Sequence, residues 1–225
     1  MSEIRVENII GETGTDAVNF TKGINVTGIV TATNVSIGSS VTAGTFHGSG
    51  AALTGVSAGK ILQVLQTVKK DVYNADVGVG ALSADIPGLS VTITPSNASN
   101  KILVSITVGL SFQDSTPKRL GATLYKGVSG GSPSVVSGAI ADASGNIQRV
   151  TFADNIGTYN RMTTLSGSYL DTAGSTNATT YSIRISHGHD GTKSIFVNRA
   201  SSSAESNHSY HMRSISTITA MEVEA

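Results

Sequence analysis

The histidines are the residues whose types and spacing come closest to a chemical site. His187 and His189 stand two residues apart and are followed by Asp190. Imidazole nitrogens are common ligands of transition metals, so this pair is a candidate metal site. The pair lies between the strand-like segments TYSIRIS and KSIFVN, and the phrase Asp-Gly-Thr that begins at Asp190 is typical of a hairpin turn. We therefore expect a plain turn there, without a metal or another cofactor.

A second group of histidines lies in the segment SNHSYHMR. The spacing of His208 and His211 would place both on one side of a helical turn. The surrounding SSSAESNHSYH is Ser-rich and is more typical of an exposed loop. Since Tyr, His and Arg suit polar contact surfaces, His208, Tyr210, His211 and Arg213 are candidates for contacts with a receptor. The alternative is a surface loop without a partner.

Catalytic motifs are missing from the sequence. It contains no HExxH, P-loop or dinucleotide fingerprint. It contains no Cys, which excludes disulfides, thiolate metal sites and a Cys nucleophile. Glycoside hydrolysis needs two carboxylates roughly 5–10 Å apart, and the carboxylates here are scattered along the chain. We expect a protein that is not an enzyme.

Charge and hydropathy restrict the partners. Lys plus Arg and Asp plus Glu number 15 each, so the formal net charge is zero. A nucleic-acid binder should carry a basic stripe, and none is visible. No run approaches the ~20 apolar residues of a membrane span, and the N-terminus does not resemble a secretory signal. We therefore expect neither nucleic-acid binding nor membrane insertion.

The elements that would position these residues begin with an uncharged segment, 23–59. It contains no Asp, Glu, Lys or Arg, yet it is too apolar and β-branched for a flexible linker. Burial contributes roughly 1.5–3 kcal/mol for each large apolar side chain, whereas ordering the backbone costs roughly 1–2 kcal/mol for every residue. One copy is therefore too poor in core to fold alone, and copies packed on one another are favoured.

The same segment repeats itself imperfectly. VTGIVTAT at 26–33 is echoed by VTAGTFHG at 41–48, which indicates short β segments with Gly at the bends. Identical chains packed together would supply the missing repeats and cover the strand edges. We predict an intertwined oligomeric β stalk at 23–59. Residues 1–22 are either its anchor or a frayed terminus.

From residue 60 the pattern predicts a head of short strands. KILQVLQTVKK at 60–70 fits a helical template, but a strand buried on both sides would look the same. KILVSITVGLSF at 101–112 reads as a long strand. Further strands are predicted at 89–93, 119–127, 134–141, 146–153, 162–170, 180–186, 193–198 and 214–223. This number suits an all-β sandwich, and two sheets of about four or five strands are expected of a jelly roll.

Several phrases resemble known virion proteins. SEIRVENII, VTGIVTAT and GTFHGSGAALTGV together resemble the N-terminal and shaft regions of fibre proteins of tailed bacteriophages, especially marine phages that infect cyanobacteria. In that family the pattern aromatic–x–Gly–x–Gly–x–x–Leu–Thr–Gly, present here from Phe46, precedes a globular head. LSVTITPSNASNKILVSITV and STITAMEVEA resemble phrases of the heads.

The resemblance implies features that the residues alone do not. It implies a homotrimer, a strand at 60–70, and a head like the trimeric jelly rolls of the tumour-necrosis-factor class. Some trimeric phage fibre tips hold iron through His-x-His, and three-fold symmetry would bring His187 and His189 of each copy to one axis. This chain departs from those fibres because it has a single such pair instead of a series.

The sequence thus predicts a structural virion protein, a homotrimeric tail or head fibre. Residues 1–22 would attach it to other virion proteins, 23–59 would form the stalk, and 60–225 would form a jelly-roll head that binds a glycan or protein of the host surface. It would be assembled in the host cytoplasm and exposed on the released particle. The first alternative is a capsid decoration or fibre protein that mainly stabilises or adsorbs. The second is a polysaccharide depolymerase.

Overall fold

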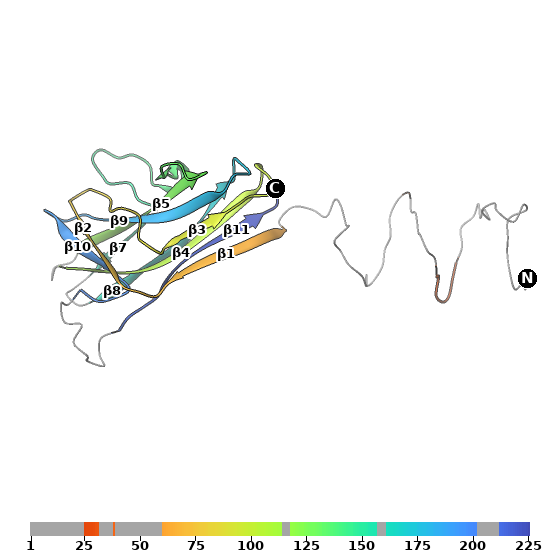
Figure 1. Ribbon diagram of the computed structural model, residues 1–225, viewed down its shortest axis with the longest axis horizontal. Helices are drawn as coiled ribbons and strands as arrows, with labels where there is room; N and C mark the ends of the chain where they lie inside the picture. The colour runs from red at the N-terminus through yellow and green to blue at the C-terminus, as the bar shows by residue number, and fades with distance from the viewer. Residues whose placement is uncertain (1–24, 32–37, 39–59, 114–117, 157–160, 202–211) are drawn as a thin grey trace, which may run out of the picture. The chain divides into compact units, whose positions relative to one another are not determined.

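Alternating side chains beyond residue 60 form two antiparallel sheets that pack face to face (Figure 1). The computed structural model describes residues 25–31, 38, 60–113, 118–156, 161–201 and 212–225. The chain divides into two compact units, Met1–Leu53 and Thr54–Ala225, and both sheets belong to the second. Within the described residues the only helical element is a short 3-10 turn, η2 (Ser137–Ala139). The expectation of an all-β sandwich is confirmed.

The strands fall into two groups. Sheet A contains β1 (Ile61–Lys69), β2 (Tyr73–Val77), β4 (Lys101–Phe112), β8 (Met162–Thr172), β10 (Lys193–Val197) and β11 (Ser216–Val223). Sheet B contains β3 (Ser90–Ile93), β5 (Lys118–Val128), β6 (Ser134–Val135), β7 (Phe152–Ile156) and β9 (Thr179–His187). No helix in these described parts of the chain is long and apolar enough to cross a membrane.

β4 is the central strand of sheet A. One edge of β4 pairs with β8, and the other edge pairs with β11 and then with β10. β1 extends the sheet beyond β11, and β2 extends it beyond β10. In sheet B, β9 lies between β3 and β5, and the far edge of β5 pairs with β6 and β7. The chain passes repeatedly from one sheet to the other, so its connections tie the two sheets together.

The core follows from a period of two residues. In β4 the side chains of Ile102, Val104, Ile106 and Val108 are buried, while the residues between them are half-buried. Successive side chains of a strand point to opposite faces, so this alternation directs one face of sheet A inward. Sheet B supplies the facing layer, which consists of Leu120, Ala122, Leu124, Tyr181, Ile183 and Ile185.

Two of the predicted strands were wrong in extent. The segment 134–141 contains only β6 and η2, and the segment 146–153 joins the sheet only from Phe152. The Val136 N–H donates to the Leu124 carbonyl (3.0 Å), and the Thr151 N–H donates to the Ala122 carbonyl (3.0 Å). These bonds occupy the edge of β5 on both sides of an excursion, so the chain between them leaves the sheet.

Most of the predictions for the N-terminal residues are not tested by the structure. Residues 25–31 contain a bend but no strand, and Val26, Ile29 and Val30 are exposed in the single chain. The other residues of the predicted attachment segment and stalk, apart from residue 38, lie outside the described residues. The intertwined trimeric stalk therefore stays a prediction.

Asn198 fastens the end of β10 to other parts of sheet A. It is fully buried and has a φ of 61°, in the left-handed region that Asn tolerates better than most residues. Its Nδ2 donates to the carbonyls of Lys69 and Asp71, both at 3.0 Å. Its Oδ1 accepts from the Ser216 hydroxyl at 2.6 Å. One side chain thus links the β1–β2 turn to β11.

Replacing Asn198 tests this link. Asn198→Gly keeps the left-handed backbone accessible but leaves the carbonyls of Lys69 and Asp71 without this donor. We expect the free energy of unfolding to fall by about 2 kcal/mol, measured by urea denaturation. Asn198→Ala should cost about 1 kcal/mol more, because a Cβ is strained at positive φ. A Gly variant as stable as the wild type would show that these hydrogen bonds contribute nothing.

Candidate functional site

His187 is a buried structural residue at the end of β9. Its side chain is 1% exposed, and its ring packs against Phe112 with centroids 5.2 Å apart. The Nδ1 atom accepts the backbone N–H of His189 at 3.2 Å. The Nε2 atom therefore carries the proton and donates to the Val77 carbonyl at 2.6 Å. Both ring nitrogens have partners, so His187 would have to give up a buried hydrogen bond to bind a metal.

The surroundings of the pair correct one detail of the prediction. The residues after His187 form a bend, but β9 belongs to sheet B and β10 to sheet A. The connection therefore crosses between the sheets and is not a hairpin turn. Across the described parts of the chain, no three His, Cys, Asp or Glu residues lie together in a way that could hold a metal ion.

The predicted receptor-binding group is described only at one end. His208, Tyr210 and His211 lie outside the described residues. Arg213 is exposed, and its backbone forms an isolated antiparallel bridge with Arg199. The segment between them therefore leaves and returns at neighbouring points of the sandwich, and its role in binding stays a prediction.

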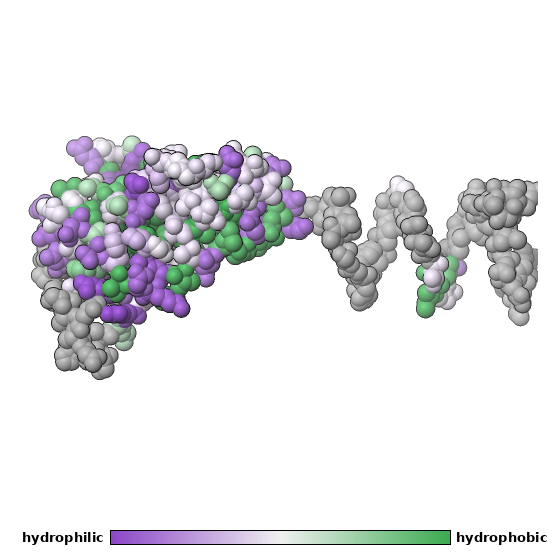
Figure 2. All heavy atoms as spheres, in the orientation of Figure 1, coloured by the Kyte–Doolittle hydropathy of each residue, from purple (hydrophilic) through white to green (hydrophobic). Residues whose placement is uncertain are grey.

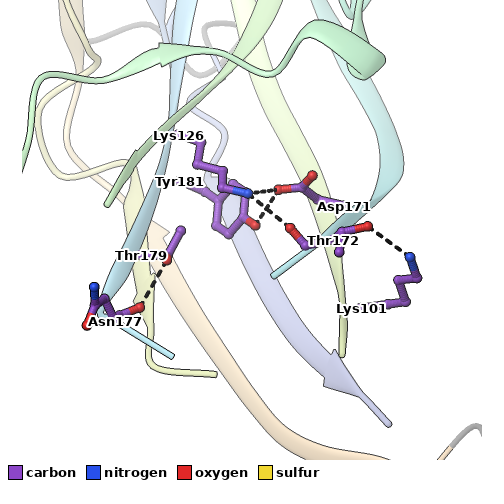
Figure 3. Close-up of polar contacts among 7 residues, drawn as sticks. All are labelled: Lys101, Lys126, Asp171, Thr172, Asn177, Thr179 and Tyr181. Atoms are coloured by element: carbon purple, nitrogen blue, oxygen red, sulfur yellow. Dashed lines mark hydrogen bonds and ion pairs between the residues drawn. The ribbon is translucent and has the colours of Figure 1, made fainter. Parts of the chain in front are cut away.

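A polar cluster bridges the two sheets inside one end of the sandwich (Figure 3). Lys126 of β5 and Tyr181 of β9 are direct cross-strand partners. From the opposite sheet, Asp171 of β8 accepts the Lys126 ammonium and the Tyr181 hydroxyl on the same Oδ2 atom, each at 2.7 Å. The ammonium also donates to the Thr172 carbonyl at 3.0 Å. Burial and the neighbouring Asp171 carboxylate raise the pKa of Tyr181 well above its ordinary value.

A cavity of about 420 Å³ opens beside this cluster. Asp171 and Lys126 form part of its wall, and the rest comes from the chain around β6, with the lining residues Val128, Gly131, Ser132, Ser134, Val135, Val136 and Ser137. Hydroxyls, one carboxylate and one ammonium can hydrogen-bond a hydroxylated ligand. The Lys126–Asp171 ion pair and the Tyr181 hydroxyl bond hold the wall in one arrangement.

Glu222 is the second polar centre at the same end. It is fully buried in β11. Its Oε1 accepts the Ser96 N–H, the Ser96 hydroxyl and the Asn100 Nδ2, each at 2.7 Å. Its Oε2 accepts the Gln63 Nε2 at 2.5 Å. The carboxylate therefore holds the β3–β4 connection and β1 against the last strand of the sandwich.

The hydrogen bonds decide the charge state of Glu222. Burial by itself raises the pKa of a carboxyl group, because it disfavours the charged form. Donation by Gln63, Asn100 and Ser96 outweighs burial and lowers the pKa of Glu222 from 4.5 to about 2. The group is thus a poor proton donor at neutral pH, and its arrangement suits an anchor.

Comparisons with known proteins add little. No protein-family model matches the sequence, and neither does any curated protein. A chain in the "Structure of infectious bursal disease virus Gx strain" is 14% identical, with a TM-score of 0.37. A chain in the "Structure of infectious bursal disease virus Gt strain" is also 14% identical, with a TM-score of 0.35. The matches cover 75% and 74% of this chain but only 42% and 40% of those chains, and likeness at this level carries no argument.

The sequence contained a signal for the polar centres that periodicity alone did not use. Glu222 has the same inward phase in its strand as Ile218 and Ala220. Asp171 has the same phase as Leu165 and Tyr169 in β8. A carboxylate on the inward phase of an alternating strand indicates a buried, hydrogen-bonded group, since an unpaired one is too costly.

Proposed function

We propose that the chain is a structural virion protein, a homotrimeric fibre of a tailed bacteriophage. Residues 1–22 attach it to other virion proteins, 23–59 form the trimeric β stalk, and 60–225 form a jelly-roll head. The head binds a glycan or protein of the host surface, and three heads on one stalk strengthen weak contacts through multivalency. The fibre is assembled in the host cytoplasm and exposed on the released particle.

The strand order of the sandwich is the observation that carries this proposal. In sheet A, β1 pairs with β11, β11 with β4, and β4 with β8, while β10 and β2 extend the sheet from β4. In sheet B, β3 pairs with β9, β9 with β5, and β5 with both β6 and β7. Apart from β6 and β7, which pair with the preceding β5, neighbours in each sheet come from distant parts of the chain, as in the double Greek key of a jelly roll. Jelly rolls occur in viral and lectin domains, which supports a structural and binding role.

The buried carboxylates favour a binder over a depolymerase. A glycosidase needs a carboxylic acid whose pKa is raised so that it can donate a proton. Burial would raise the pKa of Glu222, but the hydrogen bonds it accepts lower it to about 2. Asp171 is ion-paired with Lys126. Incubation with host polysaccharide should therefore release no reducing ends.

Labelling of particles tests the proposal directly. Antibodies raised against residues 60–225 should decorate the virion in electron micrographs. Label at the tail identifies a tail fibre, whereas label over the shell identifies the capsid decoration alternative. Particles without label would contradict a virion role.

A further inference from the structure

The outer face of sheet A carries an apolar row that crosses four of its six strands. Val64 of β1 pairs with Met221 of β11, Met221 pairs with Leu103 of β4, and Leu103 pairs with Leu170 of β8. Directly paired residues point to the same face of a sheet, so the four side chains form one continuous stripe. The neighbouring pair Ile61 and Val223 extends the stripe along β1 and β11.

This apolar row faces water in the single chain. The side chains of Val64 and Leu170, at its two ends, are 54% and 52% exposed. Figure 2 shows apolar residues gathered on the side of the head where β1 and β11 lie in Figure 1. An exposed apolar stripe that crosses four strands is a liability for a protein that stays alone in water.

At this position sheet A is polar on its inner face and apolar on its outer face. One residue away from the apolar row, the inward-facing row runs through Gln63, Glu222, Ile102 and Asp171. Sheet A thus places two carboxylates inside and four aliphatic side chains outside, the reverse of its arrangement at Val104 and Ile106. The outer face is built as a covered surface.

The chemistry of the face indicates what covers it. Beyond the apolar row, the paired outward positions are Gln66, Thr219, Ser105 and Ser168, then Val68, Thr217, Thr107 and Ser166. Lys101, beside the apolar row, is the one charged residue in these rows, and its ammonium donates to the Thr172 hydroxyl at 2.8 Å. A charged partner would find almost nothing to pair with, whereas the same uncharged face from other copies can converge with it on a three-fold axis without repulsion.

We propose that copies of this chain pack on one another through the outer face of sheet A, with the row Val64–Met221–Leu103–Leu170 at the centre of the contact. This inference rests on the proposed homotrimer and assigns its interface in the head. It agrees with the chain entering β1 directly from the uncharged segment 23–59, which is also suited to packing against copies of itself.

Sedimentation of the full chain tests the interface. Val64→Glu combined with Leu170→Glu would bury two unpaired carboxylates, so association should weaken by roughly a hundredfold or more. Ile147→Glu is the matched control, because Ile147 is 71% exposed on the β6–β7 connection and lies outside the proposed contact. The control should sediment like the wild type, and circular dichroism should show that all variants keep the β fold.

Thiol labelling provides a second measurement that needs no disruptive substitution. The chain contains no Cys, so Val64→Cys and Ile147→Cys each introduce a single thiol. The Val64→Cys thiol should react slowly with a maleimide in the oligomer and quickly after dilution to monomers. The Ile147→Cys thiol should react quickly at both concentrations.

The outcomes separate the two proposals. A wild-type chain that stays monomeric at micromolar concentration would overturn both the homotrimer and this interface. An oligomer that the double Glu variant leaves unchanged would overturn the interface alone. A Val64→Cys thiol that is protected even in the monomer would overturn it in favour of a covering segment from the same chain.

Discussion

Replacing Glu222 with Gln is expected to lower the free energy of unfolding by about 3 kcal/mol at neutral pH. The carboxylate accepts four hydrogen bonds in a fully buried position. Each hydrogen bond to a charged group contributes roughly 1.5–3 kcal/mol, and an amide can replace only part of them. Both carboxylate oxygens accept hydrogen bonds, one from Ser96 and Asn100 and the other from Gln63. The NH2 group of a glutamine would therefore point a donor at another donor in either orientation.

The acid dependence of this effect has a defined sign. Burial opposes ionisation of Glu222, but the hydrogen bonds outweigh it and lower its pKa from 4.5 to about 2. The unfolded chain therefore binds a proton at higher pH than the folded chain does. The stabilising contribution is complete above about pH 4.5 and is lost as the pH falls to about 2. The difference between the wild type and Glu222→Gln should shrink over the same interval.

Glu224→Gln is the matched control for this prediction. Glu224 is exposed, and its backbone N–H donates to the Lys60 carbonyl at 2.9 Å, a bond that the substitution leaves in place. Urea denaturation at several pH values should show no change for this variant. Equal losses for Glu222→Gln and Glu224→Gln would contradict the assignment of Glu222 as an anchor.

Periodicity predicted the strands in which apolar and polar residues alternate between turn residues. The segment 101–112 became β4. The apolar segment 60–70 fits a helical template, and only the resemblance implied the strand β1 that the structure has there. β2 (Tyr73–Val77) was not predicted, since YNADV is short and carries polar residues at Asn74 and Asp76 between its inward-facing Tyr73, Ala75 and Val77. A strand this short gains its stability from pairing with β10, which no local pattern reveals.

The polar centres could not be located in the same way. Glu222 is joined to Gln63 and Asn100, whose positions in the chain are remote from it. Their meeting depends on the order of strands in the sheet, which composition and periodicity do not determine. The surroundings of His187 could not be predicted for a related reason, because its ring bonds the Val77 carbonyl of a strand that was not predicted.

The two polar centres and the apolar row belong to one end of sheet A. Glu222 and Asp171 flank Ile102 on the inward side, and Leu103 lies one residue further on the outward side. On the inner face, Glu222 accepts a hydrogen bond from Asn100, and Asp171 accepts one from Lys126 of the other sheet. Hydrogen bonds therefore hold this end of the sandwich together. An end that is held by hydrogen bonds inside and carries an apolar outer surface is a suitable platform for packing against copies.

Replacing Asp171 with Asn is expected to lower the free energy of unfolding by about 3 kcal/mol, since it removes the partner of a partly buried ammonium. The Lys126 side chain is 21% exposed and the Asp171 side chain 14%. Tyr181→Phe alone should cost about 1 kcal/mol through its lost hydrogen bond. In the Asp171→Asn background it should cost less, because the hydroxyl has already lost its charged acceptor.

The double-mutant cycle and the loss of stability at alkaline pH together make the test specific to Asp171 and Tyr181. Burial and Asp171 raise the pKa of Tyr181, so the unfolded chain loses the phenolic proton at lower pH than the folded chain does. Stability from this group is therefore present below about pH 10 and falls as the pH rises further. Tyr181→Phe should remove that part of the alkaline loss, whereas Asp142→Asn, at an exposed position, should change nothing. Strictly additive effects of the Asp171 and Tyr181 substitutions would show that the two side chains do not act together in joining the sheets.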